Sequence, residues 1–255
     1  MSKMEKCLVF FDVDGTLLFG NTKISAADVD ALHRLQAAGH KIFINSGRSR
    51  SIVPKALTEQ VNFDGFVCGS TYIEYGGEVL HRKPVDDDTI RDVCRYAAER
   101  GLGTLLEGEV AAYGIHGGAF HPCVDITDAL EEYLQEPSKM RVTKFTFNCD
   151  ISPEIAARFP GIRVINFGGY SEGIVRGYNK AFGMQMLGEK LGVPRERLVA
   201  FGDSVNDVEM IDYAGVGVIM HSAPALLDRY AALRVDADFG GVALGIDKIF
   251  FGENK

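Results

Sequence analysis

Two aspartates two residues apart follow an apolar run near the start of the 255-residue chain. Asp12 and Asp14 come directly after residues 7–11, whose apolar side chains predict a strand buried on both faces of a parallel sheet. Alternate residues of an extended segment point the same way, so both carboxylates can face one small space. Like charges that close raise each other's pKa unless a cation lies between them. The pair therefore predicts either a bound metal, with magnesium favoured by oxygen ligands, or one protonated carboxyl group.

A serine and a glycine follow a second apolar run. Ser46 and Gly47 come after residues 41–45, for which the sequence predicts another buried strand. A helix is expected to begin near Ser49 or Ser51, and the free N–H groups of its first turn would bind an anion beside Ser46. Without the other motifs, this serine and glycine would be typical of an ordinary helix cap.

The carboxy-terminal part of the chain adds a cation and further carboxylates. Lys180 lies in the first turn of a helix predicted over residues 179–191, where a cation opposes the helix dipole unless it faces an anion. Asp203 and Asp207 follow a strand predicted over residues 198–202. Carboxylates can hold a divalent cation, while a serine, a lysine and a helix amino terminus can hold a phosphoryl group. One carboxylate would remain free to attack phosphorus, while its neighbour protonates the leaving oxygen.

Strand and helix alternate along most of the chain, which is typical of a parallel sheet with helices on both faces. The strands that carry the polar residues are expected to end at one edge of that sheet, where ligands bind in open α/β folds. Between residues 83 and 177 the order changes to a helix followed by short strands. We therefore predict a doubly wound, Rossmann-like α/β core of residues 1–82 and 178–255, with an α+β domain of residues 83–177 inserted into it.

Several helices are predicted from caps and apolar spacing. Ser25 is expected to cap a helix that ends before Gly39, with Asp28 three residues on in the manner of a capping box. In the insertion, a helix is predicted over residues 86–100, with Gly101 as its end. Further helices are predicted over residues 127–134, 153–159 and 223–230.

Composition limits the class of protein. Hydrophobic residues make up 46% of the chain, which is enough for a real core, and the formal net charge of −8 argues against a nucleic-acid partner. No stretch reaches transmembrane length, and the apolar run after the amino terminus is too short for a signal peptide. The five cysteines are widely spaced and form no Cys-x-x-Cys pair. We expect a cytoplasmic protein with reduced thiols and no membrane contact.

Taken together, the motifs resemble those of the haloacid dehalogenase superfamily. Four motifs match in order: Asp12-Val13-Asp14-Gly15-Thr16-Leu17, Ser46-Gly47-Arg48, Lys180, and Gly202-Asp203-Ser204-Val205-Asn206-Asp207. The last motif has the Gly-Asp-x-x-Asn-Asp form typical of the Cof-type sugar-phosphate phosphatases. The inserted segment is similar to the α/β cap of those enzymes.

The resemblance implies a role for each motif residue. It implies Asp12 as the nucleophile and Asp14 as general acid and then general base. Mg²⁺ would be held by the side chains of Asp12 and Asp203 and by the main-chain carbonyl of Asp14, with Asp207 as a ligand directly or through water. The phosphate group would be bound by Ser46, Gly47, Lys180 and Asn206.

The function implied is magnesium-dependent hydrolysis of a small phosphorylated metabolite, such as a sugar phosphate, through an aspartyl-phosphate. One alternative is a phosphomutase or phosphotransferase, which uses the same intermediate. The compact loop of residues 202–207 favours the phosphatase over that alternative. A second alternative is a non-catalytic phosphate-binding or regulatory protein, against which the presence of every catalytic position counts.

The insertion contains polar residues that match no standard motif. His116, His121 and Cys123 could suggest zinc, but their spacing fits no standard ligand set, and an ordinary loop is the favoured interpretation. A weaker hypothesis is that substrate is contacted from the insertion by Glu107, Tyr113, His116 and Asn148. Polar residues at strand ends are, however, usually only solvated.

Overall fold

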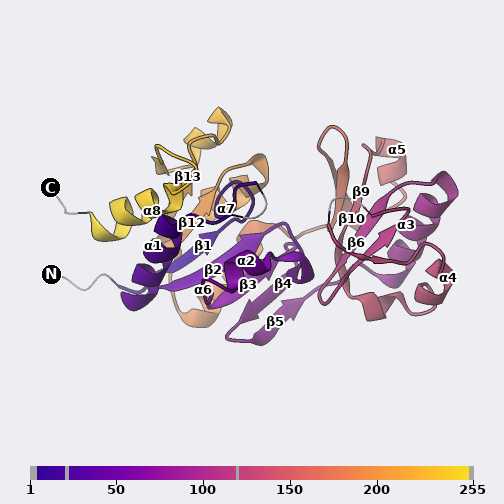
Figure 1. Ribbon diagram of the computed structural model, residues 1–255, viewed down its shortest axis with the longest axis horizontal. Helices are drawn as coiled ribbons and strands as arrows, with labels where there is room; N and C mark the ends of the chain where they lie inside the picture. The colour runs from indigo at the N-terminus through magenta and orange to yellow at the C-terminus, as the bar shows by residue number, and fades with distance from the viewer. Residues whose placement is uncertain (1–4, 21–22, 119–120, 253–255) are drawn as a thin grey trace. The chain divides into compact units, whose positions relative to one another are not determined.

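The computed structural model describes residues 5–20, 23–118 and 121–252, and it divides into two units (Figure 1). The core unit comprises residues 1–47, 54–80 and 179–255, and the inserted unit comprises residues 48–53 and 81–178. The short segment at residues 48–53 thus groups with the insertion, although the sequence assigns it to the core.

In the described part of the chain, the core sheet has eight strands in the order β14-β13-β12-β1-β2-β3-β4-β5. Its first six members are parallel to one another. Their bounds are β1 (Leu8–Phe11), β2 (Lys41–Ser46), β3 (Gly65–Cys68), β12 (Leu198–Gly202), β13 (Val216–Ile219) and β14 (Leu233–Arg234). The predicted doubly wound α/β core is therefore confirmed.

Aromatic residues on β1 explain why this strand is apolar throughout. Phe10 stacks on Phe43 of β2, at 4.9 Å between ring centroids, within the cluster that holds Met184 and Met210. Phe11 points to the opposite face, where it stacks on Phe201 of β12 at the same distance. Each face of the sheet is thus covered, as expected of a parallel sheet between two layers of helices.

The helices of the core unit begin and end at recognisable signals. Ser25 caps α1, accepting a hydrogen bond from the Ala27 amide, and Gly192 ends α6 in the left-handed conformation. The bounds are α1 (Ala26–Ala37), α2 (Lys55–Thr58), α6 (Lys180–Leu191), α7 (Val208–Tyr213) and α8 (Gly241–Ile246). A π-helical turn follows at Asp247–Phe251.

Asp28 does not complete a capping box. Its carboxylate is fully buried and accepts a hydrogen bond from the Ala243 amide of α8, at 2.8 Å. The sequence spacing identified a cap, but the side chain is used to join α1 to α8, which are far apart in the sequence.

An antiparallel hairpin at the sheet edge was not predicted. Strands β4 (Tyr72–Tyr75) and β5 (Glu78–Arg82) are joined by Gly76 and Gly77, both with positive φ, and β4 pairs antiparallel with β3. Two consecutive glycines between apolar runs are typical of a tight hairpin turn, so this signal was present in the sequence.

The inserted unit has, among its described residues, a six-stranded sheet in the order β10-β11-β9-β6-β7-β8. Its bounds are β6 (Thr104–Gly108), β7 (Ala112–Ile115), β8 (Val124–Asp125), β9 (Val142–Phe147), β10 (Ile162–Asn166) and β11 (Ser171–Val175). Most of its pairs are antiparallel. Strand β11 was missed because Gly173 interrupts its apolar pattern. The Phe145 ring occupies the space that a side chain at position 173 would need.

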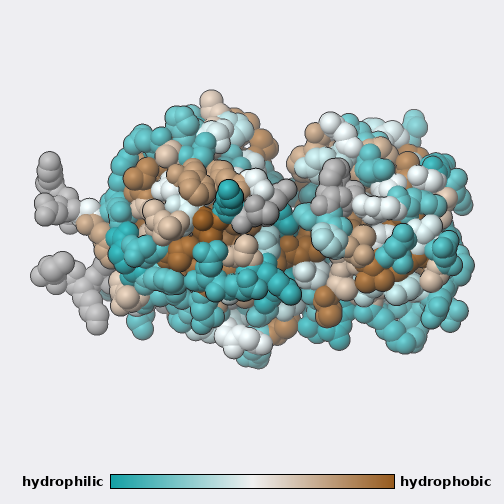
Figure 2. All heavy atoms as spheres, in the orientation of Figure 1, coloured by the Kyte–Doolittle hydropathy of each residue, from teal (hydrophilic) through white to brown (hydrophobic). Residues whose placement is uncertain are grey.

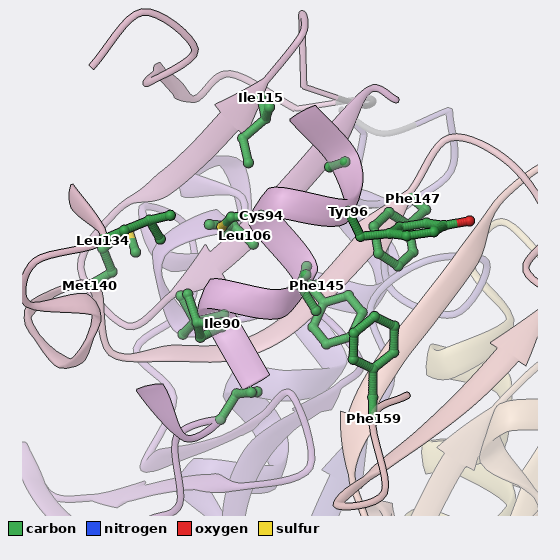
Figure 3. Packing of buried hydrophobic residues seen from close by; sticks show 14 of the residues in the cluster. Ile90, Cys94, Tyr96, Leu106, Ile115, Leu134, Met140, Phe145, Phe147 and Phe159 are labelled. Carbon is green, nitrogen blue, oxygen red and sulfur yellow. The ribbon is translucent and has the colours of Figure 1, made fainter. Parts of the chain in front are cut away.

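One face of this sheet is covered by α3 (Asp87–Arg100). Figure 3 shows the packing of aromatic side chains there: the Tyr96 ring meets Phe147 edge-on at 5.8 Å, and Phe145 meets Phe159 at 6.0 Å. Asp86 caps α3 by accepting from the Thr89 amide, and Gly101 ends it as predicted. The inserted unit therefore has a hydrophobic core of its own.

Three predicted helices are shorter than expected. The structure has α4 (Leu130–Tyr133), α5 (Pro153–Ala156) and a 3-10 turn at Ala225–Arg229 in their places. Short helices depend on tertiary packing for stability, and a local cap does not fix their length.

Hydrophilic side chains are spread over the visible face of each unit, as Figure 2 shows. This matches a chain with 24% charged residues. Among the described residues, no helix is both long and apolar enough to span a membrane.

Candidate active site

Three aspartates meet at the carboxyl end of the central strands. Asp12 follows β1 and Asp203 follows β12, and these strands are parallel neighbours, so their ends lie side by side. One carboxylate oxygen from each of Asp12, Asp203 and Asp207 lies within 4.8 Å of the others. In the part of the chain that the structure describes, this is the group of acidic, histidine or cysteine side chains that could hold a metal ion.

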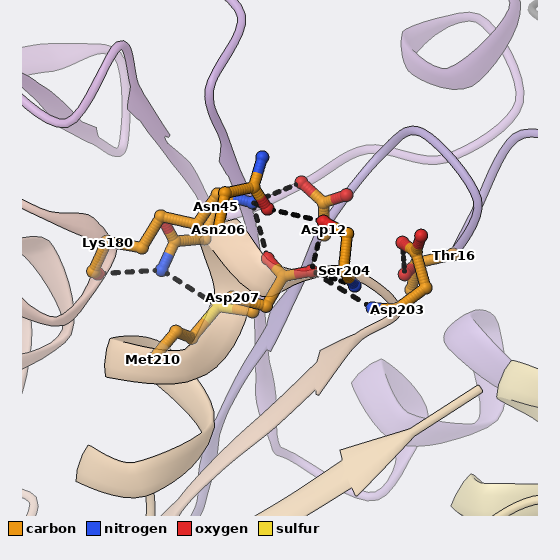
Figure 4. Close-up of polar contacts among 9 residues, drawn as sticks. All are labelled: Asp12, Thr16, Asn45, Lys180, Asp203, Ser204, Asn206, Asp207 and Met210. Carbon is orange, nitrogen blue, oxygen red and sulfur yellow. Dashed lines mark hydrogen bonds and ion pairs between the residues drawn. The ribbon is translucent and has the colours of Figure 1, made fainter. Parts of the chain in front are cut away.

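Lys180 joins this acidic group through its ammonium group. Its Nζ lies 2.6 Å from Asp12 Oδ1, 2.5 Å from Asp207 Oδ1 and 3.4 Å from Asn206 Oδ1 (Figure 4). Lys180 is the first residue of α6, which Asn179 caps, and only 3% of it is exposed. The cation in the first turn therefore faces anionic groups, as its position on the helix suggested.

In the loop after β12, hydrogen bonds explain the spacing of Asp203, Ser204 and Asp207. Asp207 Oδ2 accepts from the amides of Asp203 and Ser204, each at 3.0 Å, and the Ser204 hydroxyl completes a capping box. The other oxygen of Asp207 faces Lys180. Gly202 is required because a Cβ there would collide with the Asp207 side chain.

Thr16 orients Asp203, a role that the sequence analysis missed. The Thr16 hydroxyl donates to Asp203 Oδ1 at 2.8 Å. Gly15, with φ of 83°, lets the chain turn between Asp14 and Thr16, and a Cβ there would meet the Asp203 carboxylate. A hydroxyl that follows the Asp-x-Asp-Gly turn was the available signal.

Asp14 lies apart from the buried group. It is exposed, and its backbone forms a bridge with Leu18 in the turn after β1. Its charge contributes to the raised pKa of Asp203, so its carboxylate is near the group without being one of the three clustered side chains.

The electrostatics of the group favour an additional cation. Burial raises the pKa of Asp12 well above its usual range; Lys180 opposes this, while Asp207 and Asp203 add to it. Burial and the charge of Asp207 raise the pKa of Asp203 to about 6. Burial lowers the pKa of Lys180, but the charges of Asp12 and Asp207 outweigh it, so the ammonium form is favoured. With more carboxylates than ammonium groups, this oxygen donor set fits a hard divalent cation.

Ser46 and Gly47 end the strand next to β1. Ser46 is 1% exposed, and its carbonyl accepts from the Gly69 amide at 3.1 Å. The helix expected just after them is only a 3-10 turn, Arg50–Ile52, and the Ser49 amide donates to Glu107 Oε2 at 3.2 Å. That amide is therefore engaged by a carboxylate of the inserted unit's own sheet. The helix predicted at this point is therefore only one short 3-10 turn, and the binding of an anion beside Ser46 stays a prediction.

Asn206, which the sequence predicts to bind phosphate, is exposed in the loop that follows β12. Its Oδ1 accepts from the Ser204 hydroxyl at 2.6 Å. The amide lies near Lys180, so both residues border the space beside Asp12.

Two of the polar residues singled out in the insertion, Glu107 and Tyr113, have side-chain partners within the inserted unit. Glu107 is 2% exposed and accepts from Lys144 Nζ at 3.1 Å and Thr146 Oγ1 at 3.2 Å. The Tyr113 ring meets Tyr133 edge-on at 5.6 Å. These contacts lie within the inserted unit and serve its own packing.

Comparison with known proteins places the fold and the acidic group in one class. The family model of the haloacid dehalogenase-like hydrolases matches residues 9–244. The protein YkrA of Bacillus subtilis is 26% identical over 96% of this chain and 98% of its own length. YitU of the same organism, a 5-amino-6-(5-phospho-D-ribitylamino)uracil phosphatase, is 28% identical over 84% of this chain and 86% of its own.

A solved structure agrees with the fold. The subclass IIB sugar phosphatase BT4131 superimposes with a TM-score of 0.76 and 21% identity, covering 95% of this chain and 98% of that one. The chain belongs to the haloacid dehalogenase-like hydrolases. The expectation of a phosphatase of the Cof type is confirmed by these comparisons.

Proposed function

We propose that this chain is a magnesium-dependent phosphatase that hydrolyses a small phosphorylated metabolite through an aspartyl-phosphate on Asp12. The observation that carries the proposal is the convergence of Asp12, Asp203, Asp207 and Lys180 at the carboxyl edge of the central strands. Such a group can hold a cation and offer a nucleophile in the same small space.

In the first step, an oxygen of the Asp12 carboxylate attacks phosphorus and the bond to the leaving oxygen breaks. Asp14 gives its proton to that oxygen, so an alcohol departs. In the second step, a water molecule attacks phosphorus and passes its proton to Asp14. The bond between phosphorus and Asp12 breaks, releasing inorganic phosphate and restoring both carboxyl groups.

Other residues of the site bind and orient. The phosphoryl oxygens are bound by Lys180, Ser46, Gly47 and Asn206. Thr16 holds Asp203 in place through its hydrogen bond. Mg²⁺ would be held by Asp12, Asp203 and the main-chain carbonyl of Asp14, with Asp207 as a ligand directly or through water. When bound, it would reduce the repulsion between the attacking carboxylate and the anionic phosphate.

The substrate is proposed to be a sugar phosphate or a similar compound. Support comes from the names of the relatives: YitU acts on a phosphorylated ribityl compound and BT4131 is a sugar phosphatase. We further propose that the insertion, residues 83–177, is a cap domain that selects among such substrates.

We propose a cytoplasmic location. All five cysteines lie among the described residues and none of them forms a disulfide, which suits a reducing compartment.

The test is an assay of the purified chain for release of inorganic phosphate from a panel of phosphorylated metabolites, with Mg²⁺ and with a chelator. The wild type should be active only with Mg²⁺. Asp12→Asn should be inactive because the amide cannot attack phosphorus, whereas Asp30→Asn, at an exposed position of α1, should retain full activity.

Retained activity in Asp12→Asn would contradict the role of Asp12. Formation of an isomerised phosphate ester without free phosphate would indicate a phosphomutase. Binding of phosphate esters without turnover of any would indicate a non-catalytic protein.

A further inference from the structure

A buried asparagine lies beside Asp12 on the adjacent strand. The register of β1 and β2 places Phe10 opposite Phe43, so Asn45 is level with Asp12 at the carboxyl edge of the sheet. Its side chain shares the face of Phe43, two residues earlier, where α6 and α7 pack. Asn45 is completely buried, which is unusual for an amide side chain.

The amide of Asn45 contacts two helices of the core unit. Its Nδ2 donates to the main-chain carbonyl of Lys180 at 2.9 Å and lies 3.2 Å from Met210 Sδ of α7 (Figure 4). Among the described residues, Asn45 Oδ1 has no hydrogen-bond partner. The amide orientation follows from chemistry, because an oxygen facing the Lys180 carbonyl would be repelled.

This arrangement is costly if it serves stability alone. Leaving one buried amide oxygen without a partner carries a desolvation penalty that an apolar side chain would avoid. Asp12 lies level with Asn45 on the β1 side, but on the β3 side the neighbour of Asn45 is Val67, and Met210 is also apolar. A residue that only filled this space would therefore be better as an apolar one.

We propose that Asn45 is a positioning residue for Lys180, an inference that rests on the proposed function. Lys180 begins α6, and its long flexible side chain must bring Nζ to Asp12 and Asp207. The hydrogen bond from Asn45 fixes the backbone of that first residue relative to β2. It thereby sets the point from which the ammonium group reaches the nucleophile and the phosphate.

The first test compares Asn45→Leu, which removes the donor at similar volume, with Met210→Leu, which keeps it. Misplacement of a binding group by a fraction of an ångström to an ångström lowers turnover by up to about 100-fold, so kcat/KM of Asn45→Leu for an aryl phosphate should fall by roughly 10- to 100-fold. The inhibition constant of inorganic phosphate should rise in parallel. Met210→Leu should stay within about twofold of the wild type on both measures.

A double-mutant cycle then separates positioning from general damage. Lys180→Ala keeps the carbonyl that Asn45 contacts but removes the ammonium group. If Asn45 acts through that group, adding Asn45→Leu to Lys180→Ala should change kcat/KM and the phosphate inhibition constant by less than about twofold. If the two substitutions act independently, so that their effects on kcat/KM multiply in the double variant, the proposal is overturned. Wild-type values of both quantities in Asn45→Leu would also overturn it.

Two further controls keep the test decisive. If Asn45→Leu does not fold, as judged by circular dichroism, Asn45→Ala enters the same cycle, with the same expected and contradicting results. A wild-type chain that releases no phosphate from any ester would refute the proposed function itself. Activity in the wild type with multiplying effects would refute only the role of Asn45.

Discussion

At the scale of single residues, Asp203 shows how burial prepares a site for a cation. Thr16 donates to one of its oxygens, and burial together with Asp207 raises its pKa to about 6. Burying charged carboxylates so close together costs free energy. A divalent cation among them offsets this cost, because the cation favours their charged forms. Binding of Mg²⁺ should therefore stabilise the folded chain.

We predict that Mg²⁺ raises the unfolding temperature of the wild type. A ligand at a hundred times its dissociation constant adds about 2.7 kcal/mol to the free energy of unfolding, which is a shift of several degrees. Asp203→Asn keeps an acceptor for Thr16 but loses the charge, so most of this shift should vanish.

The control is Asp30→Asn, which changes an exposed carboxylate paired with Arg34 and should keep the full Mg²⁺ shift. Differential scanning calorimetry with and without Mg²⁺ measures both variants. An equal shift in Asp203→Asn would show that the ion binds elsewhere.

The sequence predicted most of the residues at this site. Asp12, Asp203 and Lys180 were predicted from four motifs that occur in order along the chain, together with the expectation that the elements carrying them meet at one edge of a parallel sheet. Thr16 and Asn45 were not found because their partners are Asp203 and the Lys180 carbonyl, more than a hundred residues away. The hydrogen bond of Asn45 depends on the tertiary structure and leaves no local pattern, whereas the hydroxyl that follows the Asp-x-Asp-Gly turn was a local signal for Thr16.

At the scale of elements, the start of β1 is attached to the sheet by a histidine. His40 is 5% exposed, and its Nδ1 accepts a hydrogen bond from the Cys7 amide at 3.2 Å. Its ring also meets Phe250 at 4.7 Å between centroids. An acceptor nitrogen must be unprotonated, so this contact requires the neutral ring, and burial lowers the pKa of His40.

We predict that His40 makes the folded chain less stable in mild acid. Because its pKa is lower in the folded state, the unfolded chain takes up a proton first as pH falls below about 6.5. Its contribution is thus fully present above that pH and is lost on acidification, with a slope of at most about 1.4 kcal/mol per pH unit.

Urea unfolding at a series of pH values measures this effect. His40→Gln keeps a side-chain acceptor without a titrating ring, so its free energy of unfolding should fall less between pH 7 and pH 5. Substitution of the exposed His33 by glutamine is the control and should leave the wild-type slope. Identical slopes in all three chains would refute the role of His40.

Secondary structure was predictable where the apolar pattern of a segment agrees with the burial of that segment in the folded chain. Residues 7–11 are apolar on both faces because β1 is covered on both sides, so its prediction was correct. The strand β11 was not predicted, because its Gly173 makes room for the Phe145 ring of the neighbouring strand and so breaks the apolar pattern. The hairpin of β4 and β5 did carry its signal in Gly76 and Gly77.

At the scale of the whole molecule, the chemistry and its selectivity are proposed to lie in different units. The side chains proposed for attack, proton transfer and phosphate binding all belong to the core unit. The inserted unit has its own sheet and its own hydrophobic core. Its polar residue Glu107 was a candidate for substrate contact, but Ser49, Lys144 and Thr146 occupy its carboxylate. Sequence motifs therefore identified the reaction class and left the substrate open.

The central claim is the aspartyl-phosphate on Asp12, and trapping that group tests it most directly. Asp14→Asn slows the attack of water on the intermediate because the general base is lost, while an aryl phosphate with a good leaving group still phosphorylates the enzyme without an acid. The variant is mixed with such a substrate and Mg²⁺, quenched in acid, digested, and analysed by mass spectrometry. We predict a phosphoryl group on Asp12, absent when Asp12→Asn is also introduced. A phosphoryl group on another residue, or none during measurable turnover, would contradict the account.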